Sequence, residues 1–281
     1  MNEQRIDTIY ARTFPGPVPE YARLSGTVEA DVCVIGGGLA GLNTALGLLE
    51  RGKTVALVEA KNIGFGASGR NAGFVAKGYA AGESSLAAKL GLEAAQKLVA
   101  LTKNARKLIK SRIAAMDIDC GPVVDGVLTV SWRNSGDALK KYIAAANRDF
   151  DLGFEFWPRE RVREHCKTER YFDGIYSPHD FQFDPFRYLH GLARMLAARG
   201  ARVFEQSPVL KITSDGAGWA AHTVEGIVRA QHVVVCCAIY SEGLNKKLES
   251  AVFPVRTYLM ATKPMEESLF QSSINTRHAL Y

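Results

Sequence analysis

A glycine-rich turn between two hydrophobic segments constrains the fold of this chain more than any other feature. Gly36-x-Gly38-x-x-Gly41 follows residues 31–35, which are rich in β-branched side chains and predict a strand. Leucines at three- and four-residue steps after the turn predict a helix, and residues 54–58 predict a second strand. A β-α-β unit of this kind predicts two parallel strands joined by a right-handed crossover.

In a dinucleotide-binding site, each glycine of this turn is required for a different structural reason. Gly36 allows the tight turn, Gly38 lets the backbone approach a pyrophosphate, and Gly41 lets the helix pack closely on the strand. The first amides of the helix, at Leu39 and Ala40, present N–H groups and partial positive charge to phosphate oxygens. Because glycine makes up 26 of 281 residues, an ordinary glycine-rich βα turn is the alternative.

Glu59 completes the dinucleotide pattern at the end of the second predicted strand. Its carboxylate can accept hydrogen bonds from both hydroxyls of a ribose, and it would repel a 2′-phosphate. An incidental glutamate at this position is the alternative. We therefore expect Glu59, with Ala60 beside it, to contact the cofactor.

A second glycine-rich stretch, residues 64–73, distinguishes FAD from NAD. It directly follows the strand that ends at Glu59, where a plain NAD domain would continue into a helix. Ser68 and Asn71 can hydrogen-bond the pyrophosphate or the flavin, and Arg70 can stabilise negative charge on a phosphate or on a reduced flavin. Without the preceding motif, a solvated loop would be the better interpretation. The expected cofactor contacts here are Gly66, Ala67, Ser68, Gly69, Arg70, Asn71, Ala72 and Gly73, with Arg70 and Asn71 as candidate catalytic residues.

The rest of the chain alternates helix and strand patterns irregularly, which predicts an α/β protein with two domains. We expect a Rossmann-like FAD-binding domain, with a doubly wound parallel sheet, into which an incomplete α+β substrate domain is inserted. Three prolines make residues 1–27 an N-terminal arm. The expected FAD-binding domain comprises residues 28–83 and 172–245, and the expected substrate domain comprises residues 84–171 and 246–281.

Further patterns lead to expectations with alternatives. Residues 84–116 predict one long helix with a buried leucine stripe beneath a solvated, lysine-rich face; binding to an anionic membrane is the alternative. Residues 254–262 predict a strand on which Arg256 and Tyr258 alternate and meet a substrate carboxylate. An aromatic cluster either walls a substrate pocket or packs in a core: Phe181, Phe183 and Phe186.

Composition argues against several classes of protein. The net charge of +6 is mild and spread along the chain, so it does not indicate nucleic-acid binding. The five cysteines are odd in number and lack a Cys-x-x-Cys spacing, which favours a reducing, cytoplasmic location and no metal site at His165-Cys166. Residues 1–30 lack the apolar core of a signal peptide, and no run reaches the ~18 apolar residues of a membrane span.

Together, the two glycine motifs resemble the D-amino-acid-oxidase (DAO) superfamily of FAD-dependent oxidoreductases. The resemblance begins at Val28 and includes Glu59-Ala60 and the sequence Gly-Phe-Gly-Ala-Ser-Gly-Arg-Asn at residues 64–71. Within the superfamily it is closest to γ-glutamylputrescine oxidoreductases and to related deaminating glycine/D-amino-acid oxidases. It extends over essentially the whole chain from residue 28, with supporting segments at residues 184–185, 205–209, 233–240 and 254–262.

The resemblance implies further site residues and a reaction. Besides the pyrophosphate and ribose contacts given above, Val209 would contact the adenine side through its backbone, and Cys237 and Ala238 would line the turn on the flavin side. The implied reaction removes a hydride from a C–H next to an amine nitrogen and delivers it to flavin N5. The implied substrate is a small amine or amino acid, similar to γ-glutamylputrescine or a D-amino acid, and oxygen or another acceptor then takes the electrons.

Members of the superfamily continue well past the position of residue 281, so the resemblance implies that this chain is truncated within its substrate domain. Weakened FAD binding and impaired turnover follow as an expectation, because sheet edges would be left unpaired. One rival interpretation is a catalytically inactive dinucleotide-binding fragment, and a less favoured one is an NAD-linked dehydrogenase. A homodimer is expected only from the general frequency of such assemblies.

Overall fold

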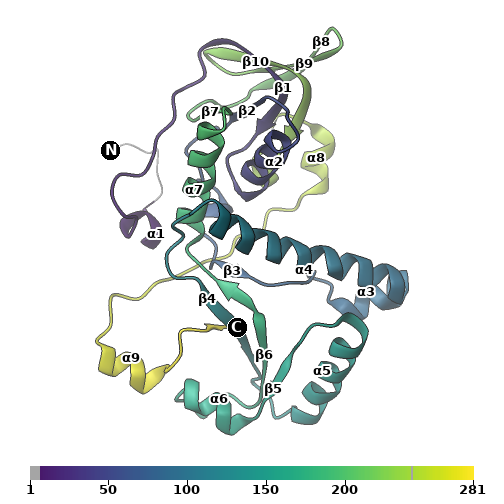
Figure 1. Ribbon diagram of the computed structural model, residues 1–281, viewed down its shortest axis with the longest axis vertical. Coiled ribbons are helices and arrows are strands. Elements are labelled where there is room, and N and C mark those ends of the chain that lie inside the picture. Colours follow the sequence, from purple (N-terminus) through teal and green to yellow (C-terminus); the bar gives the residue numbers. More distant parts are fainter. Residues whose placement is uncertain (1–6, 242) are drawn as a thin grey trace. The chain divides into compact units, whose positions relative to one another are not determined.

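A computed structural model describes residues 7–241 and 243–281 (Figure 1). The chain forms two compact units, each assembled from segments that are far apart in the sequence. The first unit comprises Met1–Asn71, Ile118–Cys120 and Pro185–Met260. The second unit comprises Ala72–Asp117, Gly121–Asp184 and Ala261–Tyr281.

The first unit is built on a six-stranded sheet. Its strands are β1 (Gly26–Ile35), β2 (Val55–Val58), β7 (Arg202–Phe204), β8 (Lys211–Asp215), β9 (Gly218–His222) and β10 (Gly226–Val235). The strand order is β7-β2-β1-β10-β9-β8. β1 is parallel to both of its neighbours, and β7 is parallel to β2, whereas β8, β9 and β10 are joined in antiparallel pairs. The predicted parallel β-α-β unit is therefore confirmed.

Two helices give the first unit most of its helical packing. α2 (Leu39–Leu49) connects β1 to β2, and it packs against β2 and against α7 (Pro185–Ala198). Leu42 and Leu46 of α2 are completely buried, as the leucine periodicity predicts. The remaining short helices are α1 (Ile9–Arg12), η1 (Ala67–Gly69), η2 (Ala238–Tyr240) and α8 (Lys246–Ala251).

The second unit has a five-stranded sheet centred on a strand that the sequence patterns did not predict, β6 (Gly174–Gln182). Its other strands are β3 (Phe74–Val75), β4 (Val124–Val130), β5 (Glu155–Trp157) and β11 (Ala279–Leu280). β6 pairs antiparallel with β3, β4 and β5, and β11 is parallel to β4. Its helices are α3 (Glu83–Leu90), α4 (Leu92–Ala115), α5 (Gly136–Phe150), α6 (Arg159–His165) and α9 (Glu267–Ser273).

The boundaries between the units differ from those expected for the domains. Residues 72–83 and 172–184 belong to the second unit, because β3 and β6 lie in these segments and pair with each other. Residues 246–260, which were expected in the substrate domain, belong to the first unit. Phe181 and Phe183 are buried in the second unit and Phe186 in the first, so core packing accounts for all three.

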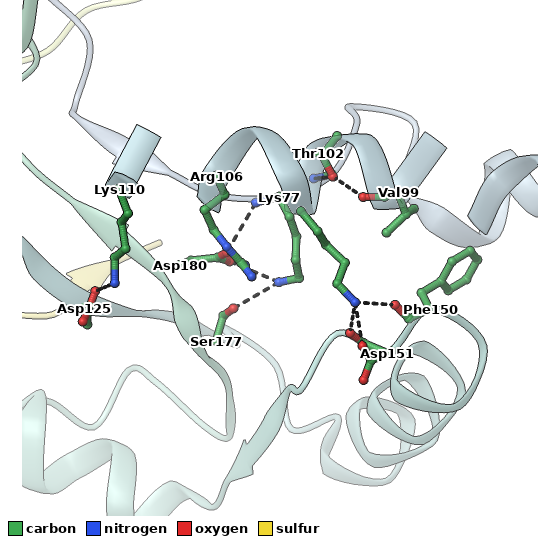
Figure 2. Close-up of polar contacts among 12 residues, drawn as sticks. Lys77, Val99, Thr102, Arg106, Lys110, Asp125, Phe150, Asp151, Ser177 and Asp180 are labelled. Carbon is green, nitrogen blue, oxygen red and sulfur yellow. Dashed lines mark hydrogen bonds and ion pairs between the residues drawn. The ribbon is translucent and has the colours of Figure 1, made fainter. Parts of the chain in front are cut away.

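The expected long helix at residues 84–116 is interrupted, and its buried face was predicted wrongly. Gly91, with a φ of +84°, separates α3 from α4. Leu101 and Leu108 of α4 are 61% and 47% exposed, whereas Arg106 is buried. Arg106 is paired with Asp180 and Lys110 with Asp125 (Figure 2). Lys103, three residues before Arg106, is paired with Asp151. The inward face of α4 is therefore apolar near its start, at Ala95 and Val99, and cationic further along, where an apolar leucine stripe was expected.

The expected strand at residues 254–262 is absent from the structure. Residues 252–265 have no regular secondary structure, and Tyr258 is 85% exposed. The β-branched and aromatic content of this segment indicates strand propensity, but the described part of the chain provides no neighbouring strand with which it pairs. No helix within residues 7–241 and 243–281 is both long enough and apolar enough to span a membrane.

Candidate functional site: a dinucleotide-binding turn

The candidate site lies at the carboxyl ends of the central parallel strands of the first unit. Ile35 at the end of β1 is in register with Val58 of β2 on one side and with Val235 of β10 on the other. The residues that follow, Gly36 and Glu59 among them, therefore emerge at one edge of the sheet. In open α/β sheets this edge, where connections leave the first strand in opposite directions, is the usual place for a ligand.

Two glycines of the turn are required by its geometry. Gly36 has a φ of +112°, and a Cβ there would lie 2.7 Å from the carbonyl oxygen of Cys236. A Cβ on Gly41 would lie 1.8 Å from the carbonyl oxygen of Gly36, so the first turn of α2 can contact β1 only without a side chain. The turn thus brings main chain from β1, α2 and the end of β10 together without intervening side chains.

The N-terminus of α2 already binds a side-chain oxygen. Ser68 of η1 accepts a hydrogen bond from the N–H of Leu39 through its Oγ, at 3.0 Å. The same Oγ lies 2.8 Å from the place that a Cβ on Gly38 would take. The first amides of a helix have no partner within it and carry partial positive charge, so this end of α2 suits a phosphate oxygen.

Glu59 is held in place by main-chain donors. Its Oε2 accepts a hydrogen bond from the N–H of Gly37 at 2.6 Å, and its Oε1 accepts one from the N–H of Lys61 at 2.8 Å. Burial raises the pKa of Glu59, these N–H groups lower it, and the charge of Glu205 raises it, with a net pKa above the usual glutamate value. Each oxygen keeps a lone pair, so the fixed carboxyl can still accept hydroxyl donors. The neighbouring Ala60 is exposed.

Glu205 is a buried carboxylate that the sequence motifs did not assign to the site. It follows β7, the neighbour of β2, and is 1% exposed. Its Oε1 accepts a hydrogen bond from the N–H of Ile63 at 2.6 Å, and its Oε2 accepts one from the N–H of Tyr21 at 3.0 Å. The sequence signals for it were its position directly after a short strand and its place in the segment 205–209 that supports the family resemblance, whereas its hydrogen-bond partners are distant in the chain.

The second glycine-rich stretch folds around η1 and contacts an aromatic side chain from beyond β10. Arg70 donates from Nε to the carbonyl oxygen of Gly66 at 3.2 Å and from Nη2 to the hydroxyl of Tyr240 at 3.3 Å. The Arg70 guanidinium also lies 5.7 Å from the centre of the Phe65 ring. Asn71 donates to the carbonyl oxygen of Ser68 at 2.8 Å, which stabilises the turn itself. Arg70, Phe65 and Tyr240 therefore form one cationic and aromatic cluster.

The remaining residues expected at the site occupy different environments. Cys237 lies at the end of β10, where burial and the charges of Glu59 and Cys236 raise the pKa of its thiol to about 11. Such a thiol stays protonated near neutral pH, which argues against redox chemistry there. Ala238 has a φ of +48° in the turn that follows, and Val209 packs at the side of the sheet core. The other expected contacts, Gly66, Ala67 and Gly69, lie in or beside η1, whereas Ala72 and Gly73 lie in the second unit.

The structure does not bring the expected substrate residues to this edge of the sheet. Arg256 and Tyr258 are exposed in the segment without regular structure that follows α8. Neither has a hydrogen bond or ion pair among the contacts of the described residues. Their assignment to a substrate carboxylate stays a prediction.

Comparison with known proteins identifies the family. Residues 31–280 match the DAO family, described as FAD dependent oxidoreductase. The chain belongs to this family. The family is FAD-dependent, and the match covers both glycine-rich motifs and both structural units.

Curated relatives extend beyond the length of this chain. A probable oxidoreductase OrdL from Haemophilus influenzae is 28% identical over 261 residues, which is 91% of this chain and 61% of the relative. Gamma-glutamylputrescine oxidoreductase from Escherichia coli is 28% identical over 252 residues, which is 89% of this chain and 59% of that enzyme. The chain thus spans about 60% of the length of the curated relatives it matches.

Solved structures show the same fold. L-amino acid deaminase from Proteus myxofaciens has a TM-score of 0.65 at 21% identity, covering 80% of this chain and 49% of that protein. Glycine oxidase from Geobacillus kaustophilus has a TM-score of 0.62 at 23% identity, covering 74% of this chain and 55% of that enzyme. Both comparisons confirm the predicted fold class, a Rossmann-like α/β domain combined with a second domain.

Proposed function

We propose that the protein binds FAD at the Gly36–Gly41 turn and takes part in oxidation of a C–H next to the nitrogen of a small amine or amino acid. The observation that carries this proposal is the carboxyl of Glu59, fixed by two main-chain N–H groups beside a turn that tolerates no side chain at Gly41. A carboxyl that accepts ribose hydroxyls beside a helix end that binds phosphate fits the adenosine half of a dinucleotide. Family membership selects FAD among dinucleotides.

The residues of this chain have distinct tasks in the proposed mechanism. The N-terminus of α2, with Ser68, binds the pyrophosphate, and Glu59 accepts the ribose hydroxyls. Arg70, held by Gly66 and Tyr240, keeps a positive charge at the second glycine-rich stretch, where it stabilises negative charge on the cofactor. When bound, FAD supplies the ring that accepts the hydride. Gamma-glutamylputrescine and amino acids are the proposed substrate classes, because curated relatives carry these activities in their names.

Dinucleotide binding without turnover is the second candidate function. It is favoured by one observation: the chain spans about 60% of the length of the curated relatives it matches. An NAD-linked dehydrogenase has less support, because the family is FAD-dependent.

The visible absorbance spectrum of the purified protein tests both candidates. The protein is mixed with FAD and freed of excess cofactor, and the spectrum is recorded again after anaerobic addition of γ-glutamylputrescine or of glycine. A retained flavin spectrum that bleaches with one of the amines supports the oxidoreductase. A retained spectrum that no amine bleaches supports the binding function alone, and a protein that retains no FAD contradicts the proposal.

A further inference from the structure

Residues 7–25, the described part of the N-terminal arm that precedes β1, are bound along the first unit. The hydroxyl of Tyr10 donates to the carbonyl oxygen of Asn71 at 2.8 Å, in the second glycine-rich stretch. Arg187 of α7 donates from Nη2 to the carbonyl oxygen of Thr13 at 3.1 Å. These contacts attach the arm to the elements that carry the candidate site.

Two buried side chains after β7 attach the second half of the arm. Glu205 accepts the N–H of Tyr21 at 3.0 Å, and its own N–H donates to the carbonyl oxygen of Ala22 at 3.2 Å. The Oγ of Ser207 accepts the N–H of Leu24 at 2.8 Å and donates to the carbonyl oxygen of Glu205 at 2.7 Å. Both side chains are at least 95% buried, so the arm segment 21–24 is bonded to groups that water does not reach.

The same carboxylate also holds the loop that follows Glu59. The N–H of Ile63 donates to Glu205 Oε1 at 2.6 Å, which is the shortest of the three hydrogen bonds to this carboxyl group. The next residue, Gly64, donates from its N–H to the carbonyl oxygen of Gly37 in the phosphate turn at 3.1 Å. The N–H of Ser207 donates to the carbonyl oxygen of Glu59 at 2.9 Å. Hydrogen bonds and short stretches of main chain therefore connect Tyr21 through Glu205 to Gly37 and Glu59.

A buried carboxylate without an opposite charge depends on its N–H donors. Among the ion pairs of the described residues, none involves Glu205, and its donors are N–H groups of Tyr21 and Ile63 and the side chain of Asn62. Loss of one donor would leave a charged oxygen buried with reduced solvation, which is unfavourable. The buried carboxylate therefore depends at once on a donor from the arm and on donors from the loop that follows Glu59.

We propose that Glu205 is a positioning residue that couples docking of arm residues 21–24 to dinucleotide binding at the Gly36–Gly41 turn. Coupling of this kind is reciprocal: if the docked arm strengthens FAD binding, FAD strengthens arm docking by the same factor. The inference rests on the proposed function, because it requires that the turn binds FAD. It adds that residues 21–24, outside both glycine motifs, belong to the cofactor site.

Limited proteolysis of the unmodified protein tests the coupling without any substitution. Arg23 lies within the docked segment with an exposed side chain, so trypsin cleavage after Arg23 reports arm release. Arg256 lies in the exposed segment without regular structure and provides an internal control. Saturating FAD is expected to slow cleavage after Arg23 by roughly tenfold, within the usual range of coupling between sites, and to leave cleavage after Arg256 unchanged. Equal rates at Arg23 with and without FAD would overturn the proposal.

Two matched substitutions distinguish a positioning role of Glu205 from a general effect of removing a negative charge near the arm. Glu205 and Glu225 both contact the arm, but Glu225 does so from the surface, with its Oε1 3.5 Å from Nη1 of Arg23 and its side chain 52% exposed. Glu205→Gln is expected to weaken FAD binding by about tenfold and to abolish FAD protection of Arg23, whereas Glu225→Gln changes FAD affinity less than about twofold. Equal affinities for FAD in these two variants would overturn the proposal.

Two further results keep the inference separate from the proposed function and from misfolding. If the unmodified protein binds no FAD, the proposed function fails and the inference fails with it. If the unmodified protein binds FAD but Arg23 is not protected, only the inference fails. Should Glu205→Gln not fold, Ser207→Ala retains the carboxylate and removes one arm contact; it is expected to reduce the protection at Arg23 several-fold. Full protection in Ser207→Ala would contradict the coupling.

Discussion

Buried carboxylates are stabilised differently in the two units of this protein. In the first unit, the half-buried Glu59 and the buried Glu205 are held mainly by main-chain N–H groups. In the second unit, Asp180 is held by two buried cations, with Nζ of Lys77 at 3.1 Å and Nη1 of Arg106 at 2.6 Å (Figure 2). Main-chain donors fix an oxygen without neutralising its charge, so Glu59 remains available to a ligand. The cations around Asp180 neutralise it, and the cluster joins α4 and β6 to Lys77, the second residue after β3.

The pKa values of Glu59 and Asp180 also differ according to whether main-chain N–H groups or cations surround the carboxyl. Burial raises the pKa of Asp180, but the charge of Lys77 and hydrogen bonds from Ser177, Arg106 and Lys77 outweigh it and hold the pKa below its usual value. Burial lowers the pKa of Lys77, and the charge of Asp180 opposes this. For Glu59 the balance is reversed, and its pKa lies above the usual value. The ionic cluster around Asp180 therefore has a structural role. The carboxyl of Glu59 is protonated more readily than an ordinary glutamate, and it must lose this proton to accept ribose hydroxyls most strongly.

Removal of the charge of Asp180 should have the largest effect. Asp180→Asn leaves Lys77 and Arg106 buried with a neutral partner, which is expected to lower the free energy of unfolding of the second unit by about 3–5 kcal/mol. Hydrogen exchange at the amides of α4 and β6 measures this loss. Asp125→Asn, at the exposed partner of Lys110, is the control and should lose less than about 1 kcal/mol. Similar losses in both variants would show that the buried cluster adds no more than a surface pair.

Glu59→Gln should affect binding and leave stability nearly unchanged. The amide NH₂ of glutamine would face one of the two main-chain N–H groups, and one acceptor for the ribose would be lost. FAD affinity is expected to fall by roughly 10- to 100-fold, since a hydrogen bond to a charged group contributes about 1.5–3 kcal/mol. Fluorescence titration with FAD measures the change, with Glu29→Gln on the exposed part of β1 as the control. Unchanged affinity would remove Glu59 from the site.

The contributions of the two carboxyl groups to stability should depend on pH in opposite directions. The pKa of Glu59 is raised, so its stabilising contribution is present at low pH and is lost as pH rises through that pKa, whereas FAD binding, which favours the ionised carboxyl, weakens as pH falls through it. The pKa of Asp180 is lowered, so its contribution is present above the usual aspartate pKa and is lost as pH falls through the lowered value.

Titration of FAD affinity across the acid range tests the first part of this prediction. The loss of affinity should begin at a higher pH than protonation of an ordinary glutamate would give. Hydrogen exchange in β6 over the same range tests the second part, and its loss should begin at lower pH. A single transition shared by both measurements would contradict the comparison.

The exposed pair on α4 should show the smallest effect. Glu93 Oε1 lies 2.7 Å from Nζ of Lys97, but the two side chains are 83% and 75% exposed. Glu93→Gln is expected to change the free energy of unfolding by less than about 0.5 kcal/mol, because solvent and salt screen such pairs. Thermal unfolding in low and high salt measures this effect. A larger, salt-insensitive change would mean that exposure does not determine the contribution of a charge pair in this unit.

Local sequence patterns predicted the β-α-β unit that carries the candidate site better than they predicted the second unit. The segment from β1 to Glu59 was predictable because strand periodicity, leucine spacing and glycine positions are all local, and its parallel pairing follows from the helix between the strands. β6 was missed because Pro178, His179 and Asp180 interrupt its hydrophobic pattern. The face of α4 was assigned wrongly because leucine periodicity normally marks the buried side.

Contacts between distant segments explain what else could not be predicted. Lys77, Arg106 and Asp180 form one cluster, but nothing in their spacing pairs them before the fold is known. The same holds for Glu205 with Tyr21 and for Arg70 with Tyr240. Sequence reasoning identified residues whose neighbours are close in the chain, and it missed those whose partners come from another segment.

The close contact at Gly41 has a consequence for how this sequence can vary. Nineteen of the twenty amino acids carry a Cβ, and at Gly41 that atom would overlap the carbonyl oxygen of Gly36 at 1.8 Å. Gly47, in the same helix, differs: a Cβ there would meet only the flexible end of Arg51 at 3.3 Å. Alanine is the stronger helix former by about 1 kcal/mol, so position 47 can be improved. Position 41 of α2 therefore tolerates no residue other than glycine, whereas position 47, six residues later, can be substituted.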